Sequence, residues 1–312
     1  MGYSFRGYSI LRGYPLAAGH DPGFAQPIFI ADYSTLKKSA DCRYIIPKGM
    51  AIASDVSCMT AFSSKVIKSA RELKKSLSVS AYVKASGWGV QFSASAGYKK
   101  ASKEVSSGQY VYILSSASCT YYFATLQELK PPPFDEVFIE WVKKLDQGKN
   151  DSGIYFEFFN VYGTHYVKEI TYGAHYTYQH RMQASTFATE RRNGVNVAVQ
   201  ASYSGLFSIG GGMKLDSSQQ QAAFDFRKSV ETKTITVGAP PPANGDAMTW
   251  ASNVKDSPLP IKYSLKSIEH LFTSEYMAGL GVNFTTIYNM IKENKQEYCK
   301  DMRLKGKVDS CL

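Results

Sequence analysis

The sequence predicts an α+β fold. Aromatic residues make up 13% of the 312 residues, and 22 of them are tyrosines, which favours a chain rich in β-structure. Apolar residues spaced three or four apart predict helices over 62–77 and 134–145. In addition, apolar and polar residues alternate in two segments, one on each side of the middle of the chain, as they do in half-buried strands.

The predicted elements follow one another along a chain long enough for one large or two medium domains. Residues 1–33 are rich in Gly, Pro and Tyr, and Asp21-Pro22-Gly23 is typical of a turn. We predict strands over 43–56, 109–126, 158–180 and 231–237, where aromatic and β-branched residues gather, and a terminal helix over 285–303. The predicted helix over 62–77 carries Lys and Arg on its polar face, which fits either a membrane surface or packing on the core of the protein.

The first alternating segment predicts a β-hairpin. Two nine-residue runs, 77–85 and 90–98, flank a Gly87-Trp88-Gly89 turn. A tilted strand needs about 9–11 residues to cross a bilayer, so either run is almost long enough. A half-buried hairpin of a soluble protein alternates in the same way, but small residues are more typical of the membrane hairpin. Its candidate lipid-facing residues are Leu77, Val79, Ala81, Val83, Trp88, Val90 and Phe92.

The second alternating segment lies between residues 195 and 209. One face has no charged residue and includes Val195, Val197, Val199, Tyr203, Phe207 and Ile209. The opposite face is mostly Ser, Asn and Gln, so the segment also fits a strand with one side in lipid. The run ends at Gly210-Gly211-Gly212, which fits either a hinge or a surface loop.

The basic residues are unevenly distributed. Residues 56–108 contain nine Lys or Arg and two Glu, whereas the whole chain has a net charge of +10. An anionic membrane surface or a nucleic acid would fit such a charge, and so would a solvated basic surface. No recognisable nucleic-acid motif is present, so we expect no nucleic-acid partner.

The middle of the chain carries the sequence Tyr162-Gly163-Thr164-His165-Tyr166, followed after six residues by Gly173-Ala174. This stretch resembles the signature of membrane-attack-complex/perforin (MACPF) domains, in which the final pair is Gly-Gly. The Ala174 side chain would make a hinge at this point stiffer. Alone, the five residues also fit a strand with a buried histidine. The opening segment, with Asp21-Pro22-Gly23-Phe24 before Pro27-Ile28-Phe29, resembles that of perforin-like proteins from apicomplexan parasites and invertebrates.

The resemblance implies a bent, twisted, four-stranded antiparallel sheet flanked by two helical clusters that can refold into transmembrane β-hairpins. We then expect a MACPF domain over 1–300 with inserts at 56–107 and 184–227, and a tail at 301–312 without a targeting domain. Gly163 and Gly173 would permit the bend, and His165 would pack and form hydrogen bonds.

The resemblance also implies a function. It indicates a secreted, cytolytic protein of the toxin or immune-effector kind, monomeric in solution, that forms a ring or arc of identical subunits on a lipid bilayer. Each subunit would contribute two hairpins to a β-barrel pore. A MACPF-fold protein in adhesion, development or membrane binding, without lytic activity, is the alternative. We expect no enzyme, cofactor or metal site, since no catalytic or metal-binding motif is present.

Four of the five cysteines are candidates for disulfides. Cys42 and Cys119 would face each other if the first two strands pair, and Cys299 and Cys311 would close a short loop, which leaves Cys58 over. Two Asn-X-Ser/Thr sequences make Asn150 and Asn283 candidate glycosylation sites in a secreted chain.

Overall fold

A computed structural model describes residues 2–80, 92–148, 150–308 and 311. Its centre is a seven-stranded sheet in which three long strands run antiparallel in the order β5-β4-β3. Their bounds are Met50–Ile67 for β3, Tyr110–Leu126 for β4 and His165–Gln183 for β5. The short strands β1 (Arg6–Tyr8) and β2 (Phe24–Pro27) extend the sheet beyond the first residues of β5, next to the 3₁₀ helix η1 (Gly2–Phe5).

The expected fourth strand is divided in two. Strand β6 (Glu231–Val237) pairs with the second half of β5, from His175 to Arg181, and β7 (Leu259–Ser267) pairs with the first half. The segment between them contains α8 (Ala247–Lys255), which is anchored by the fully buried Trp250. The predicted strand over 231–237 is therefore confirmed. However, the sheet has three long strands, and two shorter ones take the place of the fourth.

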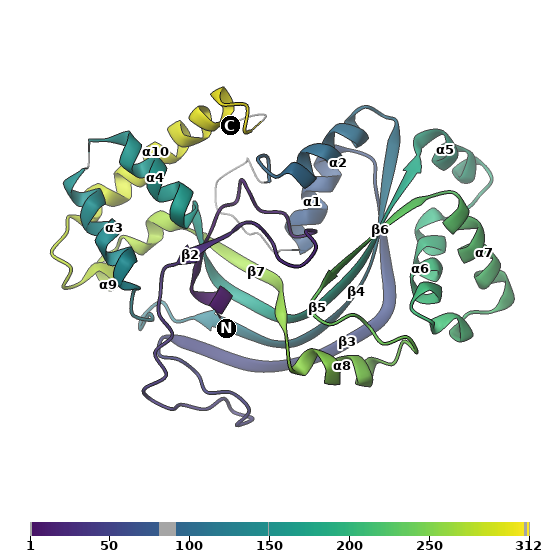
Figure 1. Ribbon diagram of the computed structural model, residues 1–312, viewed down its shortest axis with the longest axis horizontal. Coiled ribbons are helices and arrows are strands. Elements are labelled where there is room, and N and C mark those ends of the chain that lie inside the picture. Colours follow the sequence, from purple (N-terminus) through teal and green to yellow (C-terminus); the bar gives the residue numbers. More distant parts are fainter. Residues whose placement is uncertain (1, 81–91, 149, 309–310, 312) are drawn as a thin grey trace.

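Figure 1 shows that the sheet is strongly curved, with a helical cluster on either side of it. Helices α1 (Ala70–Ser80) and α2 (Ala96–Ser106) lie inside the curve, between β3 and β4 in sequence. Helices α5 (Ala184–Arg192), α6 (Val197–Ser208) and α7 (Ser217–Lys228), with the 3₁₀ turn η2 (Gly211–Lys214), lie outside it, between β5 and β6 in sequence. We call these two clusters insert one and insert two.

A further group of helices covers the far end of the sheet (Figure 1). It consists of α3 (Glu136–Gln147), α4 (Ser152–Tyr162), η3 (Ile268–Leu271), α9 (Ser274–Met277) and α10 (Phe284–Leu304). Its core is aromatic, since the rings of Phe138, Phe158 and Tyr162 pack against one another. Asp135, Asp151 and Asn283 cap the first turns of α3, α4 and α10, which satisfies backbone N–H groups that have no partner within the helix. The helices predicted over 134–145 and 285–303 are confirmed.

Several predicted boundaries differ from those in the structure. Residues 158–162, predicted as strand, form the end of α4, because Tyr155, Phe158, Phe159 and Tyr162 bury one helical face. Phe62 and Val66, predicted as helix, lie on β3, and the helix begins only at Ala70. The first strand runs from Met50 to Ile67 instead of over 43–56. Insert one therefore starts after Ile67 rather than at 56. Insert two, expected at 184–227, spans α5 to α7.

Candidate functional site

The MACPF-like motif forms the turn from α4 into β5. Gly163 ends the helix with φ 80°, and a Cβ there would lie 2.3 Å from the backbone carbon of Tyr8. The Thr164 amide donates to the carbonyl of Tyr8 at 3.0 Å, so β1 crosses the turn in close contact. The backbone angle and the close approach both require glycine here.

His165 is buried under this turn. Its Nδ1 shares a hydrogen bond of 2.9 Å with the Thr164 hydroxyl. Burial lowers the pKa of His165 to about 3, with smaller contributions from Lys295 and His270, so the ring is neutral at physiological pH. Beside it, Lys295 of α10 and Glu269 of η3 form a buried ion pair at 2.8 Å. Tyr166, the last residue of the motif, is buried as well, so these side chains serve packing rather than a solvent-accessible reaction.

Gly173 lies where three of the strand pairings in the sheet shift their register. The register shifts between Ser54 and Ser57 on β3, between Thr120 and Tyr122 on β4, and between Thr171 and Tyr172 on β5 against β7. A Cβ on Gly173 would lie 2.0 Å from the carbonyl oxygen of Cys119, and the adjacent Ala174 is fully buried. β-bulges bend strands and increase their twist, which accounts for the curvature of the sheet at this row.

Both inserts leave the sheet from a single row. Ile67 pairs with Tyr112, Tyr112 with Arg181, and Arg181 with Glu231, so the ends of β3, β4, β5 and β6 are level to within two residues. Insert one connects the first two strands of this row, and insert two connects the other two. If both inserts extended as hairpins, they would continue four neighbouring strands in the same direction.

Insert one packs into the inner side of the sheet through a few apolar residues. Leu73 and Leu77 of α1 and Ala101 and Val105 of α2 are buried, and so is Phe92 in the loop before α2. Ala81, Val83, Trp88 and Val90 lie outside the described residues, as does the side chain of Val79. At both ends of the predicted hairpin, residues 77–80 and 96–98 are helical in the structure.

Insert two shows how one sequence fits two structures. In α6 the buried residues are Val197, Ala201, Ser204 and Gly205, at helical spacing. The charge-free alternating face does not coincide with this side: Val197 and Ile209 are buried, Val195 and Tyr203 are half-buried, and Val199 and Phe207 are 40% and 39% exposed. The alternation is therefore not needed for the helical packing, although it suits a strand.

The seam between α6 and the sheet has polar contacts beside an apolar cluster that includes Val197, Ala201 and Ile113. Ser202 donates to the hydroxyl of Ser64 on β3 at 2.8 Å, and Ser64 donates to Ser115 on β4 at 2.8 Å. A Cβ on Gly205 would lie 2.6 Å from the Phe62 ring, so α6 lies close against β3. Nearby, the buried His180 ring of β5 packs edge-on against Phe226 of α7 at 4.9 Å. Hydroxyl pairs can exchange for water at low cost, so these polar contacts add less to the hold on α6 than the apolar cluster does.

The three glycines after α6 are docked in the structure. Gly210 has φ 81°, and a Cβ there would lie 1.7 Å from the carbonyl oxygen of Ala243. Gly211 begins η2, Gly212 approaches the Phe207 ring, and Lys214 donates to the carbonyl of Gly245 at 3.1 Å. The hinge role of these glycines stays a prediction.

A family model described as MAC/Perforin domain matches residues 2–305. The chain belongs to the MAC/perforin domain family. Members of this family are pore-forming or membrane-binding proteins rather than enzymes.

Two solved structures resemble this MAC/perforin chain. GNIP1Aa from Chromobacterium piscinae has a TM-score of 0.66 and 17% sequence identity, over 96% of this chain and 56% of that chain. A Bacteroides thetaiotaomicron protein with a MAC/Perforin domain has a TM-score of 0.50 and 11% identity, over 96% of this chain and 60% of that chain. This chain thus spans little more than half the length of GNIP1Aa, and the likeness concerns the fold alone.

The disulfides of this MAC/perforin chain differ in part from the expectation. Cys119 bonds to Cys58, so the expected pair of Cys42 and Cys119 is wrong. The reason is the late start of β3: Cys58 and Cys119 are direct partners in the β3–β4 ladder, whereas Cys42 precedes β3 and is exposed. The structure joins Cys299 to Cys311. Disulfides persist in oxidising compartments, which favours an extracellular location.

The remaining candidate residues are at the surface. Asn150 and Asn283 are both exposed, and Asn283 also caps α10 through its side-chain oxygen. Their glycosylation stays a prediction.

In the described part of the chain, no group of three or more His, Cys, Asp or Glu side chains could hold a metal ion. None of the described helices combines the length and apolar character needed to span a bilayer.

Proposed function

We propose that this MAC/perforin chain is a secreted pore-former. It assembles with identical subunits into a ring or arc on a membrane, and each subunit inserts the two segments 68–109 and 184–230 as β-hairpins. The soluble form is a monomer in which both segments are packed as helices on the curved sheet. The net charge of +10, concentrated in insert one, favours an anionic lipid surface as the target.

The row in which the four strands end carries the proposal. Because Ile67, Tyr112, Arg181 and Glu231 lie side by side, extension of both inserts adds four antiparallel strands with no change in pairing order. Each insert has more than about 40 residues, or about 20 for each arm of a hairpin, whereas a tilted strand needs about 9–11 to cross a bilayer. Edge strands cannot remain unpaired in lipid, so insertion requires neighbouring subunits.

The proposal is tested by release of a dye from liposomes that contain phosphatidylserine, with Val199→Lys as the decisive variant. Val199 is 40% exposed in α6, so a lysine costs little in the helical form. On the lipid side of a hairpin it would cost about 2–4 kcal/mol per subunit near the bilayer centre. We expect dye release to be lost while the monomer keeps its melting temperature.

The matched control is Gln200→Lys, which adds the same charge on the neighbouring, water-facing position of the hairpin. It should release dye like the wild type. Equal activity of the two variants would contradict insertion of this segment. Intact liposomes of several lipid compositions, with no rings in electron micrographs, would instead favour a non-lytic role in adhesion, development or membrane binding.

A further inference from the structure

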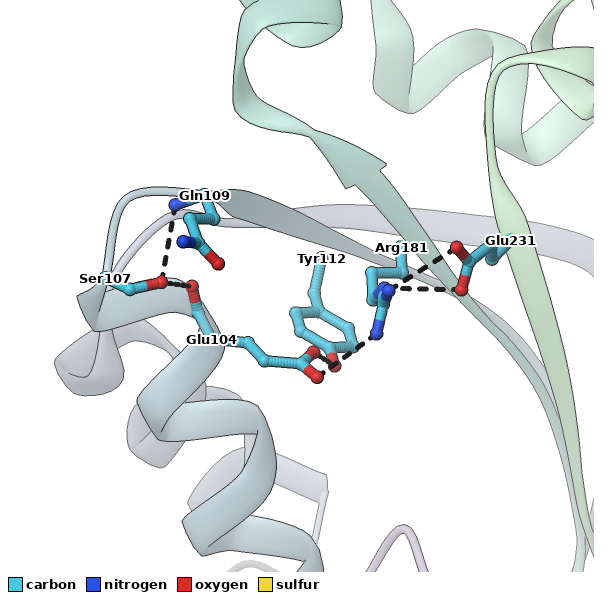
Figure 2. A network of polar contacts seen from close by, with 6 residues as sticks. All are labelled: Glu104, Ser107, Gln109, Tyr112, Arg181 and Glu231. Atoms are coloured by element: carbon cyan, nitrogen blue, oxygen red, sulfur yellow. Dashed lines mark hydrogen bonds and ion pairs between the residues drawn. The ribbon is translucent and has the colours of Figure 1, made fainter.

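A charged network joins insert one to the base of insert two (Figure 2). Arg181 of β5 donates through Nη1 to Oε1 of Glu104 on α2 at 3.1 Å. Its Nε lies 3.3 Å from Oε2 of Glu231 on β6. The Tyr112 hydroxyl of β4 donates to Glu104, and the Arg181 guanidinium lies 4.1 Å from the centre of the Tyr110 ring. One guanidinium thus contacts a carboxylate of insert one and the carboxylate of its ladder partner on β6.

The positions of the two carboxylates differ in kind. Glu231 is the ladder partner of Arg181 and directly follows insert two, so it would remain opposite Arg181 if β5 and β6 extended. Glu104 belongs to the body of insert one and would leave with α2. The short loop from α2 to β4 has a local contact of its own, in which the backbone amide of Gln109 donates to the hydroxyl of Ser107 at 3.5 Å.

Burial makes the Glu104 contact the stronger of the two. The side chains of Arg181 and Glu104 are 24% and 19% exposed, whereas that of Glu231 is 74% exposed. Burial lowers the pKa of Arg181, but the carboxylates of Glu104 and Glu231 more than offset this, so the guanidinium remains charged. Charged hydrogen bonds with little solvent around them are stronger than those at an open surface.

We propose that Arg181 couples the release of the two inserts, an inference that rests on the proposed function. While Glu104 holds one edge of the guanidinium, the other edge stays fixed against Glu231. The first ladder pair of β5 and β6, Arg181 with Glu231, is then held together. When α2 leaves the sheet, Arg181 loses its buried partner and turns toward solvent. Glu231, whose side chain is 74% exposed, then holds the guanidinium alone, so the first ladder pair of β5 and β6 frays more easily and insert two is held less firmly at its base. Departure of insert one therefore favours departure of insert two.

Hydrogen exchange of the soluble protein, without membrane, tests the coupling apart from pore formation. The variant is Glu104→Gln, whose amide can still bond to Tyr112 but has no charge for Arg181. We expect amide exchange to become about three- to tenfold faster both in α2 and at the base of insert two, around Lys228 and Glu231, as for loss of a charged hydrogen bond. The control is Glu157→Gln, which removes the 2.9 Å ion pair between Glu157 and Lys144 far from both inserts.

Arg181→Lys gives a second test, because an ammonium cannot bridge two carboxylates as the guanidinium fork does. It should loosen both regions, and the double variant with Glu104→Gln should be no looser than either single one. Faster exchange in α2 alone would overturn the coupling, as would additive effects in the double variant. In dye release, Glu104→Gln should shorten the lag on phosphatidylserine liposomes. If exchange changes as expected but no variant releases dye, the coupling stands and the pore function fails.

Discussion

A disulfide across the seam between insert two and the sheet should lock the protein in its soluble form. Ser64 on β3 and Ser202 on α6 have hydroxyl oxygens 2.8 Å apart, so cysteines at both positions lie within reach of a disulfide. We expect Ser64→Cys/Ser202→Cys to crosslink under oxidation, in a Cys42→Ser background that removes the exposed free thiol.

The magnitude follows from the distance that residue 202 must travel. It lies 19 positions beyond Gln183, the end of β5, and an extended strand rises about 3.3 Å per residue, which gives about 60 Å. A bond between residues 64 and 202 forbids this displacement. The loop that it closes contains more than about 100 residues, so the crosslink should also stabilise the monomer by up to about 4–5 kcal/mol.

The assay is dye release from phosphatidylserine liposomes before and after addition of a reductant. The oxidised double variant should release dye only to the extent of its uncrosslinked fraction, and reduction should restore activity. The background variant treated with the same reductant controls for reduction of Cys58–Cys119, and each single cysteine variant controls for the substitutions. Dye release at the background rate by a fully crosslinked sample would refute the reasoning, because insert two would then not need to leave β3.

Three further outcomes are expected. Gly163→Ala should destabilise the protein by about 1–3 kcal/mol in denaturant unfolding, because the backbone has φ 80° and a methyl group would meet the Tyr8 backbone; Gly194→Ala, at a similar φ but in open space, should cost less. Burial lowers the pKa values of His165, His175 and His180 to about 3, 4 and 4, so the unfolded chain binds more protons below pH 6.5. Stability should be complete above pH 6.5 and fall toward pH 4 by up to about 1.4 kcal/mol per pH unit for each histidine, and a melting temperature that stays constant over this range would contradict it. Cys119→Ser should cost about 2–4 kcal/mol of unfolding free energy while Cys42→Ser costs almost none, and equal losses would argue against the Cys58–Cys119 bond.

The order of the elements follows from local pattern, but their ends do not. Strand formers predicted β4, β6 and most of β5, and helical spacing predicted α3. Apart from Asn160, the misassigned residues at 62, 66 and 158–162 are aromatic or β-branched, and tertiary packing decided between helix and strand there. The pairing of Cys58 with Cys119 depended on the start of β3, so an error of seven residues in that start selected the wrong cysteine.

The inserts mark the limit of what alternation can predict. Residues 195–209 have the pattern of a strand, but 197–208 are packed as a helix. The alternating face and the buried helical face share Val197, Ala201 and Gly205, and they differ at Val199, which is exposed. Nothing in the sequence predicted the contact between Glu104 and Arg181, since these residues are 77 positions apart and belong to no motif. Their contact depends on the position of α2 inside the curve of the sheet, which only the folded chain defines.

The bond between Cys58 and Cys119 has a consequence for the accuracy of any later refolding. It ties two residues that are already opposite each other, below the point where insert one begins. If insert one extends as proposed, the bond would oppose a slip of one residue between the two arms that continue β3 and β4. Such a slip would turn apolar side chains toward water and serines toward lipid. Under the proposed function, a covalent bond already present in the folded protein would thus set the alignment of the new hairpin.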